Sequence, residues 1–94
     1  MLFISKHILE EIKEKFLSEL AKGSYMQKII QGDFIADRGQ VVEYDFIIHA
    51  VLYRDDAGNL TDIIPVWWEF HTFIDGEQVN NEFYFNDLKK LIFK

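Results

Sequence analysis

Residues 41–79 decide the fold, and they read VVEYDFIIHAVLYR (41–54), DDAGN (55–59), LTDIIPVWWEFHTFI (60–74), DG (75–76) and EQV (77–79). Every even position from Val42 to Leu52 is apolar or aromatic, which is the two-residue period of a strand with one buried face. The second long segment repeats this pattern at Leu60, Ile64, Val66, Trp68, Phe70 and Ile74. DDAGN has the composition of a turn, and Asp-Gly favours a two-residue hairpin. The stretch therefore predicts two consecutive antiparallel hairpins.

The two turns predict a single register for these strands. Pairing residue 54 with 60 keeps even positions opposite even ones, so that Phe46 lies near Trp68 and Tyr44 near Phe70. Pairing 74 with 77 then directs Val79, Phe83 and Phe85 of a fourth strand to the same buried side. Pro65 cannot donate to a ladder, so it marks a bulge or lies beyond the end of the fourth strand. A bulge there would reverse the facing of residues 60–64.

The flanking segments complete an α+β layout. Residues 25–36 are expected to form a first strand, which a loop with a left-handed Gly39 joins to the next strand. The four-residue apolar spacing of 5–22 predicts the main helix, with Ser5 as its N-cap and Gly23 as its left-handed stop. Asn86 is expected to cap a short terminal helix that returns Leu88, Leu91 and Ile92 to the core.

The predicted fold is one α+β domain, residues 1–94, with an N-terminal helix on a bent four-stranded antiparallel meander and a short C-terminal helix. The order is α-β-β-β-β-α, and the sheet is expected to bend at Gly32 and Pro65. By analogy of architecture alone, this layout is similar to cystatin-like folds and to the cone-shaped sheets of nuclear-transport-factor-type proteins. No sequence motif identifies a family, and fold analogy does not indicate function.

Composition and charge exclude several classes of protein. A 49% apolar and 16% aromatic content excludes a disordered tail, and the absence of cysteine excludes disulfides, thiolate metal sites and a cysteine nucleophile. Residues 23–84 carry three basic and eleven acidic side chains, so their net charge of −8 disfavours nucleic-acid binding. No apolar stretch is long enough for a membrane span or a signal peptide, which predicts a cytoplasmic protein. No phosphate-binding loop or catalytic motif occurs, so neither an enzyme nor a cofactor is expected.

The second face of the long hairpin is the candidate functional surface. Adjacent strand residues point to opposite faces, so Trp67 and Trp68 cannot both face the main helix. The expected binding surface comprises Trp67, Phe73, Ile47, Val51, Tyr53 and Ile63, with an acidic rim of Glu43, Asp45 and Glu69. Aromatic anchors with a charged rim are typical of protein–protein interfaces. This surface predicts a small non-enzymatic interaction, regulatory or inhibitor module that binds a protein partner or a second copy of itself.

Two alternatives remain open from the sequence. The terminal helix could fold across this face and bury it. Alternatively, the same face could bind a small molecule or a divalent metal, because the predicted register sets Glu43 opposite His71 and Asp45 opposite Glu69, with His49 nearby. The candidate metal ligands are then Glu43, Glu69 and His71. The same register sets Ile47 opposite Trp67.

Overall fold

A computed structural model describes residues 1–94 and contains two helices and four strands. They are α1 (Lys6–Ser18), β1 (Tyr25–Ile35), β2 (Val41–Arg54), β3 (Leu60–Ile74), β4 (Glu77–Val79) and α2 (Phe85–Ile92). The predicted order α-β-β-β-β-α is confirmed.

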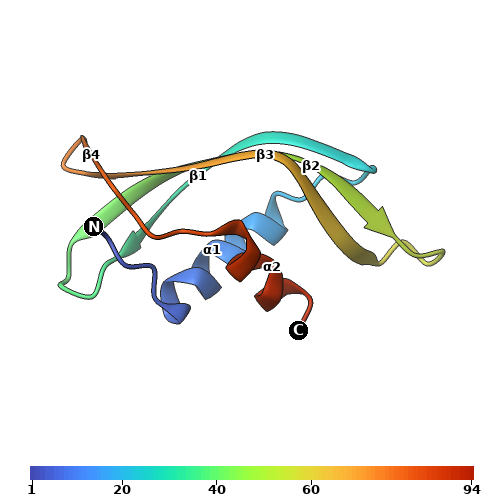
Figure 1. Cartoon of the computed structure of the whole chain (residues 1–94), viewed down its shortest axis with the longest axis horizontal. Helices are drawn as coiled ribbons and strands as arrows, with labels where there is room; N and C mark the ends of the chain where they lie inside the picture. The colour runs from blue at the N-terminus through green and yellow to red at the C-terminus, as the bar shows by residue number, and fades with distance from the viewer.

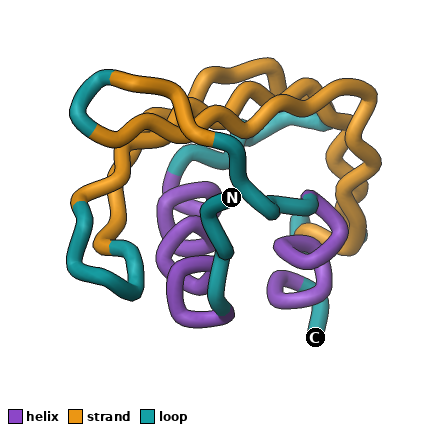
Figure 2. The backbone as a smooth tube through the Cα atoms, turned by 60° about the vertical axis from the view of Figure 1, so that its left-hand side comes forward, coloured by secondary structure: helices purple, strands orange, loops and turns teal.

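The four strands form one open antiparallel sheet in the order β1-β2-β3-β4. The sheet arches over the two helices, which lie on the same side of it (Figures 1 and 2). We call the side that faces the helices the inner face and the opposite side the outer face. Because α2 lies beside α1 under the inner face, the terminal helix does not fold across the outer face (Figure 2).

The core fills the space between the inner face and the helices. The predicted alternation of β2 is confirmed, since all six of its even positions from Val42 to Leu52 are buried. Phe16 of α1 packs against Phe46 of β2 and Phe85 of α2, with ring centroids 5.8 and 6.3 Å apart. Phe83 stacks on Phe70 at 4.0 Å. These aromatic contacts join both helices to one face of the sheet.

The register between β2 and β3 differs from the prediction. Arg54 pairs with Leu60 as expected, but the ladder then shifts twice, between Tyr53 and Arg54 and between His49 and Ala50. Each shift leaves one residue of β3 unpaired, first Thr61 and then Val66. Phe46 therefore lies opposite Phe70, and Tyr44 opposite Thr72.

The shifts reverse the facing of part of β3. Ile63 is buried on the inner face, whereas Ile64 and Val66 are exposed. The uninterrupted alternation that placed Ile64 and Val66 in the core and Ile63 on the outer face is therefore wrong, and the alternative of a bulge at Pro65 that reverses the facing of the preceding residues is confirmed. The reason is that a bulge inserts one residue and so inverts the two-residue period on one side of it. Pro65 lies at this irregularity and also beyond the end of β4.

Helix ends are also corrected. Ser5 caps α1 by accepting a hydrogen bond from the Ile8 amide, but the helix ends at Ser18, and Gly23 does not adopt a left-handed conformation. The residue before α2 is Tyr84, so Asn86 lies inside the first turn and caps nothing. β4 has only three residues, and Phe83 and Phe85 reach the core from beyond it.

The predicted turns adopt the expected backbone. Gly39 is left-handed, with φ of 82°, and the hairpin residues Asp75 and Gly76 have φ of 51° and 81°. Two positive φ angles in a two-residue loop are the signature of a type I′ turn. The glycine of β1 has a different role, because a Cβ at Gly32 would lie 2.6 Å from the Tyr44 hydroxyl oxygen.

Candidate functional site

The outer face consists of the odd residues of β1 and β2 together with the residues of β3 that pair with them. Pairing across the strands arranges them in rows, which are Ile35–Val41, Asp33–Glu43–Phe73, Gln31–Asp45–His71, Ile29–Ile47–Glu69, Gln27–His49–Trp67, Tyr25–Val51–Ile64 and Tyr53–Asp62. No lysine or arginine lies in any row. A sheet face that met only water would be polar throughout, and this one is not.

The two ends of the outer face differ in chemistry. One end carries three carboxylates, since Asp33 lies directly opposite Glu43 and Asp45 follows in the next row, with the exposed Ile35 and Val41 in the last row beyond them. A shallow hollow of about 500 Å³ opens there, and its lining includes these three side chains and Phe73. The other end is mainly apolar and aromatic, because Trp67 is followed by the row of Tyr25, Val51 and Ile64 and then by Tyr53. Asp62 lies opposite Tyr53 and pairs with Lys89 of α2 at 2.8 Å. We call these the acidic end and the aromatic end.

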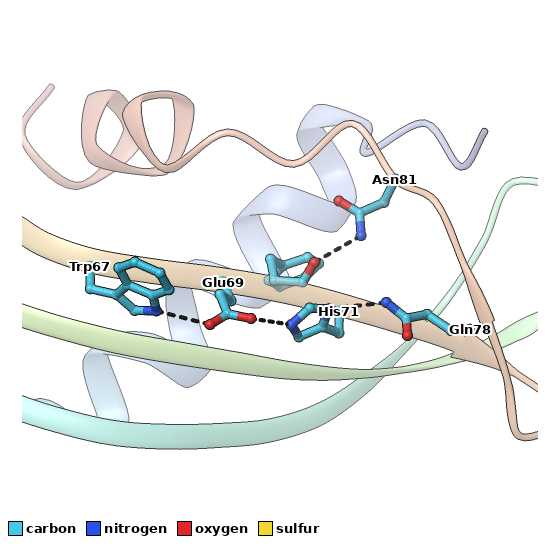
Figure 3. A network of polar contacts seen from close by, with 6 residues as sticks. Trp67, Glu69, His71, Gln78 and Asn81 are labelled. Atoms are coloured by element: carbon cyan, nitrogen blue, oxygen red, sulfur yellow. Dashed lines mark hydrogen bonds and ion pairs between the residues drawn. The ribbon is translucent and has the colours of Figure 1, made fainter.

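A chain of hydrogen bonds along β3 orders the side chains between the two ends (Figure 3). Trp67 Nε1 donates to Glu69 Oε2 at 2.9 Å, and His71 Nε2 lies 2.7 Å from Glu69 Oε1. A carboxylate only accepts, so Nε2 of the imidazole carries a proton and donates it. In the neutral ring, Nδ1 is then free to accept from the Gln78 amide at 3.1 Å. The network holds the exposed indole in one orientation.

The Glu69 carboxylate is the centre of this network. Hydrogen bonds from His71 first, and then from Trp67, hold the pKa of the Glu69 carboxyl below its usual range. Each oxygen of the Glu69 carboxylate thus accepts one hydrogen bond, Oε1 from His71 and Oε2 from Trp67. Asp45, in the row opposite His71, accepts a hydrogen bond from Gln31 at 3.0 Å.

The predicted metal ligands do not come together. Glu69 meets His71, but Glu43 lies opposite Phe73, because the bulges displace β3 relative to the predicted register. Asp45 likewise faces His71 rather than Glu69, and Ile47 faces Glu69 rather than Trp67. No group of three histidine or acidic side chains could hold a metal ion.

Most of the predicted binding surface does lie on the outer face. Trp67 and Tyr53 are exposed, and Phe73, Ile47 and Val51 are half-buried in the rows, as are Asp45 and Glu69 of the rim, while Glu43 is exposed. Ile63 is the exception, since it is fully buried on the inner face. Sequence reasoning missed Tyr25, Ile29 and Ile64. Tyr25 and Ile29 could have been found from the sequence. The first hairpin pairs odd residues with odd ones, so the odd positions of residues 25–35 lie on the same face as those of β2.

Comparison with known proteins adds no relative, because no protein-family model, curated protein or solved structure matches this chain. Fold and surface therefore define the protein as an α+β open-sheet domain with one uncovered, acid-bearing aromatic face. Neither helix has the length and apolar character needed to cross a membrane.

Proposed function

We propose that this chain is a non-enzymatic protein–protein interaction module of the regulatory or inhibitor type, which binds a partner protein on its outer face. The observation behind the proposal is that no helix or loop lies over this face, and α2 reaches it only through the Lys89 side chain at Asp62 (Figure 1). The face nevertheless presents Trp67 at 56% exposure and Ile29 at 64%. Exposed aromatic and aliphatic groups on a rigid sheet are the composition of an interface centre. A partner would bury them and so remove apolar surface from water.

The charges on the outer face indicate what kind of partner it fits. The rows contain the acids Asp33, Glu43, Asp45, Glu69 and Asp62 but no lysine or arginine. Lys89 of α2 pairs with Asp62 at 2.8 Å, so a partner with lysine or arginine beside an apolar group is complementary to the other four. The hollow at the acidic end suits a guanidinium or ammonium group, with the Phe73 ring in its lining. Two copies of this face would set carboxylates against carboxylates or against apolar side chains, which disfavours self-association through it.

The network along β3 favours binding by preorganisation. Trp67 is anchored through its indole N–H, so the side chain has already lost rotamer freedom before a partner arrives. An ordered aromatic anchor therefore contributes more of its burial to affinity than a mobile one would. The short spacing between Trp67, Glu69 and His71 places an apolar group, an anion and a polar ring within one binding footprint.

A phage-displayed library of random linear peptides provides a direct test. We expect the enriched peptides to combine an aromatic or large aliphatic residue with lysine or arginine, and their affinity to fall with rising salt. NMR shift changes should map to the odd residues of β2 and to Trp67. Trp67→Glu should abolish binding, while the matched control Tyr84→Glu should not, because Tyr84 is equally exposed at 60% but precedes α2.

Three outcomes would contradict the proposal. The first is that the enriched peptides lack basic residues and bind with no dependence on salt. The second is that shift changes map to another surface, such as the hollow beside Met1 and Phe3. The third is that Trp67→Glu remains folded and binds as tightly as the wild type.

A further inference from the structure

The outer edge of β1 carries a row of unpaired backbone groups. β1 lies at the end of the sheet and bonds only to β2. At the two ends of β1, the Leu52 amide donates to the Ser24 carbonyl and the Ala36 amide donates to the Gln40 carbonyl. Hydrogen-bonded pairs alternate along an antiparallel ladder, so the even residues of β1 exchange hydrogen bonds with β2. The odd residues Tyr25, Gln27, Ile29, Gln31, Asp33 and Ile35 therefore direct their N–H and C=O groups away from the sheet. No turn, loop or side-chain hydrogen bond reaches the backbone of residues 25–35.

The opposite edge of the sheet is protected, whereas β1 is not. β3 extends beyond β4, but that part contains Pro65 and the two register shifts. In addition, Asn81 Nδ2 donates a hydrogen bond to the Phe70 carbonyl. β1 has eleven residues, no proline and no register shift. Its one lysine, Lys28, lies at an even position and pairs with Glu19 at 4.0 Å. Native proteins usually block such edges with charges, prolines or bulges, because an open edge pairs with another strand.

We propose that β1 pairs with β1 of a second copy of this chain, antiparallel about a two-fold axis, to form one continuous sheet. A register centred on Ile30 overlaps the whole strand. It sets Tyr25 opposite Ile35, Gln27 opposite Asp33 and Ile29 opposite Gln31 of the second copy. All of these residues have outward backbone groups, so every such group in one copy finds a partner in the other.

The side chains of β1 suit this arrangement. No carboxylate opposes another carboxylate, because Asp33 meets Gln27, and Lys28 meets Gly32 of the second copy. A two-fold interface uses the same surface twice and closes on itself, so it does not propagate into fibres. The outer faces of the two copies would lie side by side on one surface, which leaves both of them free. The proposal therefore does not depend on the proposed function of that face.

The test combines solution mass with amide exchange. Concentrated wild-type protein should have twice the monomer mass of 11.2 kDa and should dissociate on dilution. Gln27→Pro removes one outward N–H without touching a β2 hydrogen bond, and it should remain monomeric at concentrations where Gln27→Ala, which keeps the N–H, is dimeric. Circular dichroism would verify that both variants fold. In the wild-type dimer, the odd amides of β1 should gain protection from hydrogen exchange by a factor of at least about 10, while in dilute samples only the even ones are protected.

Several results would overturn this inference. The inference is wrong if the wild-type chain stays monomeric at millimolar concentration. It is also wrong if a dimer forms in which the odd β1 amides still exchange freely. A dimer that Trp67→Glu dissolves and Gln27→Pro does not would place the contact on the outer face instead. Exchange in the wild type decides the question even if Gln27→Pro fails to fold. If monomeric Gln27→Pro still binds the selected peptides, the outer face works without the dimer, and the two proposals can then be tested independently.

Discussion

Two neighbouring isoleucines of β3 provide a sharp test of the fold. Ile63 is fully buried against the core, whereas Ile64 is 42% exposed on the outer face, because the shifted register reverses the facing of this part of β3. Truncation to alanine removes three carbons from either side chain. At about 0.8 kcal/mol for each buried carbon, the loss at Ile63 is about 2.4 kcal/mol, and the cavity left behind raises it to about 3–4 kcal/mol.

The same truncation at Ile64 should cost about 1–1.5 kcal/mol, because less than two thirds of that residue leaves water on folding and the open site leaves no closed cavity. Urea denaturation followed by tryptophan fluorescence measures both losses. With a slope of roughly 1–3 kcal/mol per molar urea, Ile63→Ala should lower the midpoint by more than about 1 M. In thermal unfolding, it should lower the melting temperature by more than about 10 °C.

Each isoleucine serves as the control for the other, since the two variants delete the same atoms one residue apart. Equal losses, or a larger loss at Ile64, would refute the reasoning. They would mean that β3 alternates without interruption through Pro65 and that Ile64 belongs to the core.

Three further predictions concern single groups. Gly32→Ala should destabilise the fold by about 1–3 kcal/mol in urea denaturation, because the new Cβ would lie 2.6 Å from the hydroxyl oxygen of the buried Tyr44 side chain. An unchanged urea midpoint would show instead that the Tyr44 ring moves aside freely. Burial, reinforced by the charges of nearby carboxylates, raises the Tyr44 pKa to about 12, so the contribution of Tyr44 to stability should be constant below pH 10 and be lost as pH rises from 10 to 12. Tyr44→Phe should lose this alkaline dependence. The Glu69 pKa is lowered by hydrogen bonds, so the contribution of Glu69 to stability is present above the usual glutamate pKa and is lost as pH falls through its folded pKa. Indole fluorescence should change in that acidic range, because Glu69 accepts from Trp67, and the same acid response in Glu69→Gln would contradict the assigned network.

The fold was predictable wherever one signal was local and uninterrupted. Every even position of β2 from Val42 to Leu52 is apolar or aromatic, so its inner face follows from the sequence alone. The Asp75–Gly76 turn requires positive φ angles that few residues tolerate, and it sets the pairing of Ile74 with Glu77 directly. In both cases the information lies within a few consecutive residues.

The register of β3 was not predictable in the same way. Both faces of residues 60–67 carry large apolar groups, so the pattern fits either facing. Pro65 indicates one bulge, but it fits equally well a position beyond the end of β4, and no residue marks the second bulge at Thr61. This one uncertainty accounts for the errors at the candidate site. The shifted register places Glu43 opposite Phe73 instead of His71, and it places Ile63 in the core.

The sequence by itself determined the element order, the turns, the buried face of β2 and the presence of an aromatic surface with acidic neighbours. Only the tertiary structure decided that this surface stays open. Phe83 and Phe85 enter the same core as Phe16, and these contacts hold α2 beneath the inner face. An amphipathic helix of eight residues has no preferred side of its own, so the long-range packing of those rings chooses its side. The same packing leaves the outer face uncovered.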